Sequence, residues 1–261
     1  MSDASPLDAP AVLAGVYCGL LAVGAAWAVG LPRPVLVVGG LLGWFAVALA
    51  LSGRPSVWVS LGRRRLLALP MYVPLLPLLV ATVALESESA PAVPLSWVLW
   101  LLGLVIAGFG LWTAGMSAYA ARVAGERRAA WTAAPDPVAR RRRRVGAVVA
   151  GLGAVGAVVG MFVGLPAVFL TLCVVATALL WVSSGRSRSY EACDGGLRAT
   201  DSGAAASQFE PWTRFAAVRE TDGAVVLERR WWLDERMAAA DVPDEALETL
   251  EALIEGAGSG S

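Results

Sequence analysis

The sequence predicts a polytopic α-helical membrane protein, with about six transmembrane helices followed by a small β-rich C-terminal domain that an α-helix closes. Of 261 residues, 57% are hydrophobic and the mean hydropathy is +0.64, whereas a soluble domain is about 45 to 50% apolar. Residues 1–183 carry 13 Arg against 6 acidic residues, and residues 184–261 carry 8 against 15. Such asymmetry is typical of a basic membrane-facing part and an acidic solvent-facing part.

Six apolar stretches approach the length of about 20 residues that crosses a bilayer, and none contains Asp, Glu, Lys or Arg. They are 10–30, 34–52, 66–85, 95–118, 145–163 and 166–183. Three prolines predict a kink in the third stretch. We therefore expect a cytoplasmic tail at 1–9, four helices within 10–118, a cytoplasmic basic loop at 119–144, a transmembrane hairpin at 145–183, the C-terminal domain at 187–255 and a flexible tail at 256–261.

The arginines between these stretches predict the orientation. The loop at 53–65 contains four arginines and the segment at 119–144 contains eight. The loops on the opposite side contain one arginine, Arg33. Because arginine accumulates on the cytoplasmic side of short loops, we expect a multi-pass protein of the cell membrane with both termini in the cytoplasm.

A run of five arginines precedes the predicted hairpin. Positive-inside anchoring explains this run, and contact with anionic lipid headgroups is a second use that is compatible with the first. Nucleic acid is not an expected partner, because the run adjoins the bilayer and lacks interleaved aromatic residues. The candidate lipid-contact residues are Arg140, Arg141, Arg142, Arg143 and Arg144.

The fifth apolar stretch is rich in glycine. Gly156, Gly160 and Gly164 recur at every fourth position, which predicts a face for close helix packing. Residues 151–156 also match GxGxxG, but no strand precedes them and no acidic residue follows at the distance that a dinucleotide site requires. The similar segments 29–32 and 163–166 leave open whether the first and last helix pairs are a duplication.

Short β-type runs with turn signals follow Arg186. Asp222-Gly223 predicts a hairpin with a type I′ turn, and alternation along the second strand predicts a buried Trp231. The alternative is that Trp231 and Trp232 form a membrane-inserting tip beside two arginines. A final helix is predicted from the N-cap candidate Asp241 and an apolar stripe at Ala246, Leu247, Leu250, Leu253 and Ile254.

The step Phe209-x-Pro211-Trp212-x-x-Phe215, together with the strands and the closing helix, resembles the bacterial PH-like domain. In that family a transmembrane hairpin commonly leads into the domain, so the resemblance covers roughly 140–255. It implies that the aromatic residues of this region belong to the core or the binding interface of a PH-like domain: Trp212, Phe215, Trp231 and Trp232.

Composition argues against an enzyme, because the chain has no His or Lys to serve as a general base or an amine nucleophile. The three cysteines lack ligand-like spacing, and we predict no catalytic residue, metal or cofactor. We expect a non-catalytic membrane scaffold whose C-terminal domain binds a partner protein, a lipid headgroup or another copy of itself. The alternative is a transporter or channel subunit for a small neutral solute.

Overall fold

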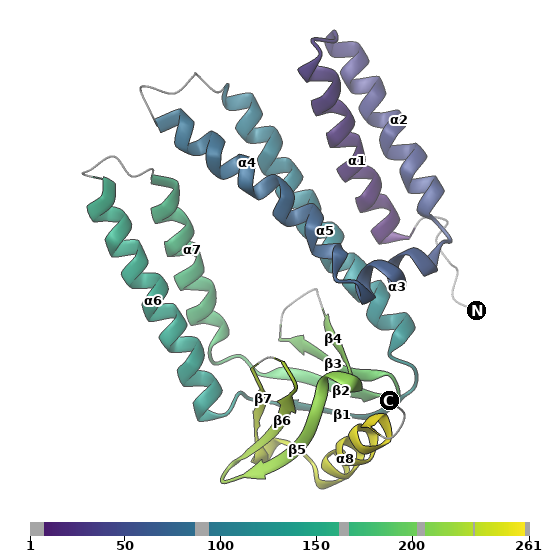
Figure 1. Ribbon diagram of the computed structural model, residues 1–261, viewed down its shortest axis with the longest axis vertical. Helices are drawn as coiled ribbons and strands as arrows, with labels where there is room; N and C mark the ends of the chain where they lie inside the picture. Colours follow the sequence, from purple (N-terminus) through teal and green to yellow (C-terminus); the bar gives the residue numbers. More distant parts are fainter. Residues whose placement is uncertain (1–7, 87–93, 162–166, 203–206, 232, 259–261) are drawn as a thin grey trace. The chain divides into compact units, whose positions relative to one another are not determined.

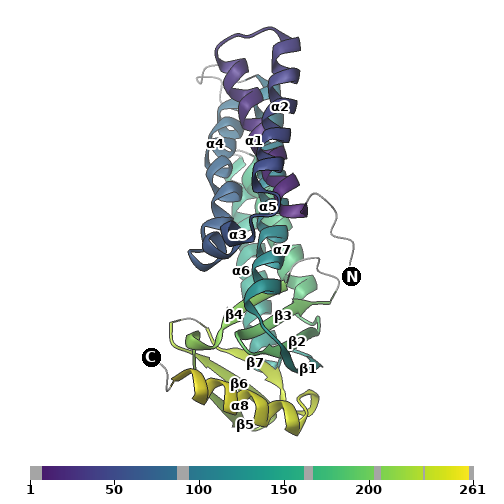
Figure 2. The same cartoon turned by 90° about the vertical axis from the view of Figure 1, so that its right-hand side faces the viewer.

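The computed structural model describes residues 8–86, 94–161, 167–202, 207–231 and 233–258. The chain forms two compact units, Met1–Tyr119 and Ala120–Ser261. Figures 1 and 2 show that the first unit is helical and that the second joins a helical hairpin to a β region.

The first unit contains a tightly packed helix pair, α1 (Ala9–Ala28) and α2 (Arg33–Leu51). Glycine permits the close approach, because a Cβ built on Gly15 would lie 2.5 Å from the Trp44 carbonyl oxygen and one on Gly19 would lie 2.7 Å from that of Gly40. No side chain larger than hydrogen fits at these two positions without moving a backbone.

A short helix, α3 (Pro55–Arg63), occupies the segment expected to be the first basic loop, and α4 (Leu69–Glu86) follows a turn of η1 (Leu66–Ala68). The break between α3 and the following helix bends the chain by 97°, and Arg65 there has a left-handed backbone with φ of 58°. Pro74 and Pro77 lie inside α4. The sharp bend is therefore at the arginines that precede the prolines.

Four of the described helices are long and apolar enough to cross a membrane. They are α1, α2, α5 (Leu95–Val123) and residues 137–160 of α6 (Pro137–Met161). The bent pair of α3 and α4 would make a fifth span if counted as one. Since α7 (Ala167–Ser183) has only 17 residues, the expected number of about six spans is not confirmed.

The described residues of the second unit form seven antiparallel strands in two sheets. The four-stranded sheet has the order β1 (Arg127–Ala133), β2 (Arg188–Cys193), β3 (Gly196–Asp201) and β4 (Ser207–Pro211). After η2 (Trp212–Arg214), the three-stranded sheet has the order β5 (Phe215–Thr221), β6 (Ala224–Arg229) and β7 (Glu235–Ala238). The chain ends with η3 (Ala239–Asp241) and α8 (Asp244–Gly258).

The strand β1 lies inside the segment 119–144 that was expected to be a basic loop. It pairs along its length with β2, so that Ala133 lies opposite Arg188 and Trp131 lies opposite Tyr190. Burial alternates at its end, since Trp131 and Ala133 are buried and Thr132 is exposed. The chain therefore starts the four-stranded sheet, leaves it to form the α6–α7 hairpin, and returns to continue the same sheet.

One apolar core lies between the two sheets and α8. It includes Trp131 and Ala133 of β1, Tyr190 of β2, and Leu227 of β6, and Leu250 of α8 is fully buried against them. A boundary at residue 187 would remove the two β1 side chains from this core. Residues of β1 thus share a core with the predicted C-terminal domain at 187–255.

Helix α8 has the expected amphipathic pattern, with Ala246, Leu250 and Ile254 buried. Asp241 does not cap it. The carboxylate of Asp241 accepts a hydrogen bond from the Ala134 amide at 2.9 Å, so this residue instead fixes the end of β1.

Candidate functional site

The end of the β region from which α6 starts and to which α7 returns contains a cluster of buried charges. One carboxylate oxygen of Glu235 accepts hydrogen bonds from Arg188 Nη1 at 3.0 Å and from the Tyr190 hydroxyl at 2.8 Å. The other oxygen accepts from Arg229 Nη2 at 3.0 Å. The side chains of Arg188, Arg229 and Glu235 are 16%, 14% and 11% exposed, so this carboxylate connects two largely buried cations.

Two further carboxylates balance these arginines. Arg188 makes a bidentate contact with Asp201 through Nε and Nη2. Arg229 Nε lies 2.8 Å from Glu210 Oε2, although neither atom has hydrogen-bond geometry there. Three carboxylates thus face two guanidinium groups, and every member of the cluster has an opposite charge in contact.

The buried environment shifts the ionisation of the two groups beside Glu235. Burial, then the neighbouring Glu235, raises the pKa of Tyr190 well above its ordinary value. Burial disfavours the Arg188 cation, but the hydrogen bond that Arg188 donates to Asp201 and the charge of Glu235 outweigh this effect and hold the Arg188 pKa above its ordinary value. Tyr190 therefore acts as a neutral donor and Arg188 as a permanent cation, which is an arrangement for structure and not for proton transfer.

Asp136 connects β7 to the start of α6. It is 1% exposed, and its Oδ1 accepts from the Ala139 amide at 2.6 Å while its Oδ2 accepts from Arg236 Nε at 2.9 Å. A carboxylate at this position caps the orphan amides of a helix and complements its dipole. This residue thereby offsets part of the unfavourable charge of the arginines in the next two turns.

The candidate lipid-contact arginines lie in the first two turns of α6. Arg141, Arg142 and Arg144 are exposed. Arg140 is half-buried and donates to the Pro135 carbonyl at 3.1 Å, and Arg143 is near enough to Tyr190 to lower its pKa. Three of the five guanidinium groups are therefore directed to the surface beside the start of the hairpin.

The turn between β2 and β3 is hydrogen-bonded to the segment that joins α5 to β1. Asp194 accepts from Arg128 Nε at 2.6 Å and from the Glu126 amide at 3.1 Å, and these two bonds hold the pKa of its carboxyl below the ordinary value. A Cβ on Gly195 would lie 2.1 Å from the Val123 carbonyl oxygen. Asp194 thus joins two parts of the chain that are far apart in the sequence.

The four candidate aromatic residues divide between core and surface. Trp212 and Phe215 are 3% and 1% exposed, and the Trp212 indole donates to the Cys193 carbonyl at 2.8 Å. Trp231 is 93% exposed, so the expectation that alternation buries it is wrong: β6 ends at Arg229, before this residue. Trp232 lies outside the described residues.

The candidate glycines of the packing face differ in their burial. Gly160 is buried, whereas Gly156 is exposed and a Cβ built on it meets nothing within 4 Å. Gly164 lies outside the described residues. A Cβ built on the neighbouring Gly151 would lie 3.7 Å from Thr177, and one built on Gly153 would lie 3.3 Å from Cys173. A contact face that includes Gly156 therefore stays a prediction.

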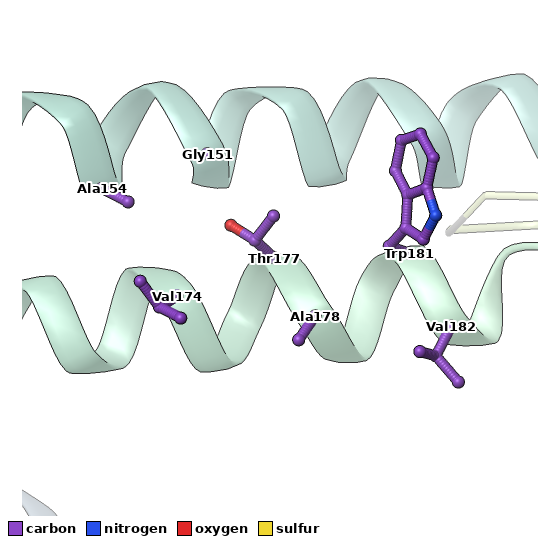
Figure 3. Close-up of a pocket in the computed structure, with 7 residues that line it drawn as sticks. All are labelled: Gly151, Ala154, Val174, Thr177, Ala178, Trp181 and Val182. Atoms are coloured by element: carbon purple, nitrogen blue, oxygen red, sulfur yellow. The ribbon is translucent and has the colours of Figure 1, made fainter.

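A groove of about 430 Å³ lies along α6 and α7 (Figure 3). Figure 3 shows the Thr177 and Trp181 side chains directed from α7 toward α6. The Thr177 hydroxyl donates to the Cys173 carbonyl of its own helix at 2.7 Å. The groove has no charged side chain among its lining residues, which are Gly151, Ala154, Val174, Thr177, Ala178, Trp181 and Val182.

The described part of the chain contains no group of three or more Cys, Asp or Glu side chains placed to bind a metal ion. Comparison of the chain with protein-family models, with curated proteins and with solved structures finds no match. The buried charge cluster, the exposed arginines and the exposed Trp231 therefore have to be interpreted from their own geometry.

Glu235→Gln should destabilise the β region by about 2 kcal/mol or more, because it leaves Arg188 and Arg229 largely buried with less compensating charge. The measurement is urea-dependent labelling of the buried Cys193 thiol in the full-length protein, with Cys18 and Cys173 replaced by Ala. The matched control is Glu228→Gln, in an ion pair with Arg219 whose cation is 65% exposed. It should cost no more than about 1 kcal/mol, and equal losses in the two variants would contradict the role of Glu235.

Proposed function

We propose that this protein is a non-catalytic multi-pass membrane protein, with both termini in the cytoplasm, that presents a PH-like binding or assembly domain at the inner face of the cell membrane. The observation that carries the proposal is the pairing of β1 with β2 across the α6–α7 hairpin. Because the hairpin is an insertion within one sheet, both of its ends are joined to neighbouring strands of that sheet.

Short connections strengthen this argument. Three short connections join the β region to apolar helices. The chain passes from α5 to β1 between Val123 and Arg127, from β1 to α6 between Ala133 and Pro137, and from α7 to β2 between Ser183 and Arg188. An extended chain covers about 3.5 Å per residue, so the longest of these connections reaches no more than about 17 Å. With its helices in a bilayer, the β region would therefore lie at the bilayer surface, where a scaffold needs a binding domain.

The order of strands supports a PH-like domain. Four antiparallel strands form the first sheet, three form the second, and an amphipathic helix closes the core. Trp212 and Phe215, from the motif that carries the resemblance, are in that core. With β1 included, the strands number seven, although residues 187–255 alone supply six.

The charge cluster argues against catalysis. Its carboxylates are engaged by arginines and by Tyr190, and its Tyr190 pKa is shifted away from the range in which a proton is exchanged near neutral pH. Three hydroxyls within the apolar helices do not support the alternative of solute passage, because Thr113, Ser117 and Thr177 each donate to a carbonyl of their own helix.

The orientation predicts a specific labelling pattern. In a variant without native cysteines, Leu31→Cys, in the exposed turn between α1 and α2, should react with an impermeant thiol reagent added outside intact cells. Glu255→Cys, on the exposed face of α8, should react only after lysis, because the arginine-rich segments are expected on the cytoplasmic side. The reverse pattern would invert the proposed topology.

The binding role is tested by photo-crosslinking in native membranes. A benzophenone amino acid replacing the exposed Glu248 of α8 or the exposed Glu220 of β5 should yield one reproducible adduct, either with another protein or with a second copy of this chain. The control adds Trp131→Ala, which removes a core side chain of β1 and should abolish the adduct. Absence of any adduct, with solute flux in proteoliposomes, would favour the transporter alternative.

A further inference from the structure

The turn between β6 and β7 exposes a large apolar surface. Trp231 is 93% exposed and Leu233 is 61% exposed, and the neighbouring Arg230 is also exposed. We call these three residues the Trp231 tip. Scattered apolar side chains are common on protein surfaces, but a tryptophan with almost no contact to its own domain is not.

Contacts of the flanking residues place the Trp231 tip at the end of the β region that joins the hairpin. Arg229 precedes the tip and Glu235 follows it, and Glu235 binds Arg188, the first residue of β2 after α7. The next residue, Arg236, binds Asp136, which caps α6. Figure 1 shows the β6–β7 turn at the side of the sheets to which α6 and α7 connect.

The same end of the unit carries the groups expected at a membrane interface. Arg141, Arg142 and Arg144 are exposed in the first turns of α6, and Trp181 is 60% exposed near the end of α7. Tryptophan side chains concentrate at the headgroup level, where the ring is partly in hydrocarbon and the indole N–H is in water. Arginines beside them are attracted to anionic lipid headgroups.

We infer that the Trp231 tip inserts into the interfacial region of the bilayer that holds α6 and α7, with Arg230 at the headgroups. The tip is then a further attachment of the β region to the membrane, formed by a loop that does not lead into a membrane helix. It fixes which side of the β region faces the lipid and leaves α8 and its acidic exposed face, with Glu245, Glu248, Glu251 and Glu255, directed elsewhere. This inference rests on the proposed membrane position of the hairpin.

Depth-dependent quenching tests the inference in the full-length protein. A variant without native cysteines receives one cysteine labelled with an environment-sensitive fluorophore, and is reconstituted into vesicles of equal parts phosphatidylcholine and phosphatidylglycerol that contain spin-labelled lipid. Leu233→Cys should lose fluorescence to the lipid quencher. Asp222→Cys, in the exposed turn at the opposite end of β6, should lose little, and adding Trp231→Ser should reduce the quenching at position 233.

A third site separates failure of this inference from failure of the proposed function. Val155 is 62% exposed in the apolar part of α6, so Val155→Cys should be strongly quenched if the hairpin crosses the bilayer. Quenching at 155 with none at 233 would contradict insertion of the Trp231 tip and leave the membrane placement of the hairpin intact. Trp231 would then face a protein surface and not the lipid. No quenching at either site would overturn both.

Discussion

Pairing of β1 with β2 joins two chain segments that the whole α6–α7 hairpin separates, and the rest of the second unit depends on it. The pairing adds the edge strand β1 to the four-stranded sheet, and it brings Trp131 onto Tyr190 with the two rings stacked at 5.6 Å. It also places Ala133 and Arg188, the residues beside the two ends of the hairpin, directly opposite each other. A hairpin whose ends are held in this way starts and finishes at one place on the β region. The α6–α7 hairpin and the β region therefore belong to the same compact unit.

The buried charge cluster joins the two sheets at the end of the β region from which the hairpin starts. Arg188, Tyr190 and Asp201 belong to the first sheet, Glu235 and Arg229 belong to the second, and the bonds between them fasten the two sheets at the hairpin end. Such networks cost desolvation energy and contribute mainly when every partner is present. Asp136 joins α6 to the second sheet in the same way, because its carboxylate accepts hydrogen bonds both from the first turn of α6 and from Arg236 of β7. The apolar core, in contrast, lies between the sheets and α8.

Local patterns in the sequence predicted the features that depend on neighbouring residues. Asp222-Gly223 predicted the β5–β6 turn, where Gly223 adopts a φ of 79°, and the apolar stripe predicted the buried face of α8. Strand β1 was missed because its buried positions include only one large side chain, Trp131, among alanines, and because the arginines around it are typical of a loop. Its partner strand, β2, also comes only after the whole α6–α7 hairpin in the sequence. Trp231 was misplaced because alternation was extended past the end of β6, and only the structure shows where a strand ends. The charge cluster joins residues from 188 to 235, which no local pattern relates.

Cross-strand disulfide formation in native membranes tests the central claim, the pairing of β1 with β2, most directly. The hydroxyls of Thr132 and Ser189 lie 3.3 Å apart on directly opposed residues, a spacing that suits a disulfide. In a variant without native cysteines, Thr132→Cys with Ser189→Cys should oxidise readily, and mass spectrometry should detect one linked peptide pair. Thr132→Cys with Thr200→Cys is the control, since Thr200 lies opposite Ser189 on the next strand, about 10 Å from β1. Equal yields from both pairs, or none from the first, would contradict a sheet closed across the hairpin.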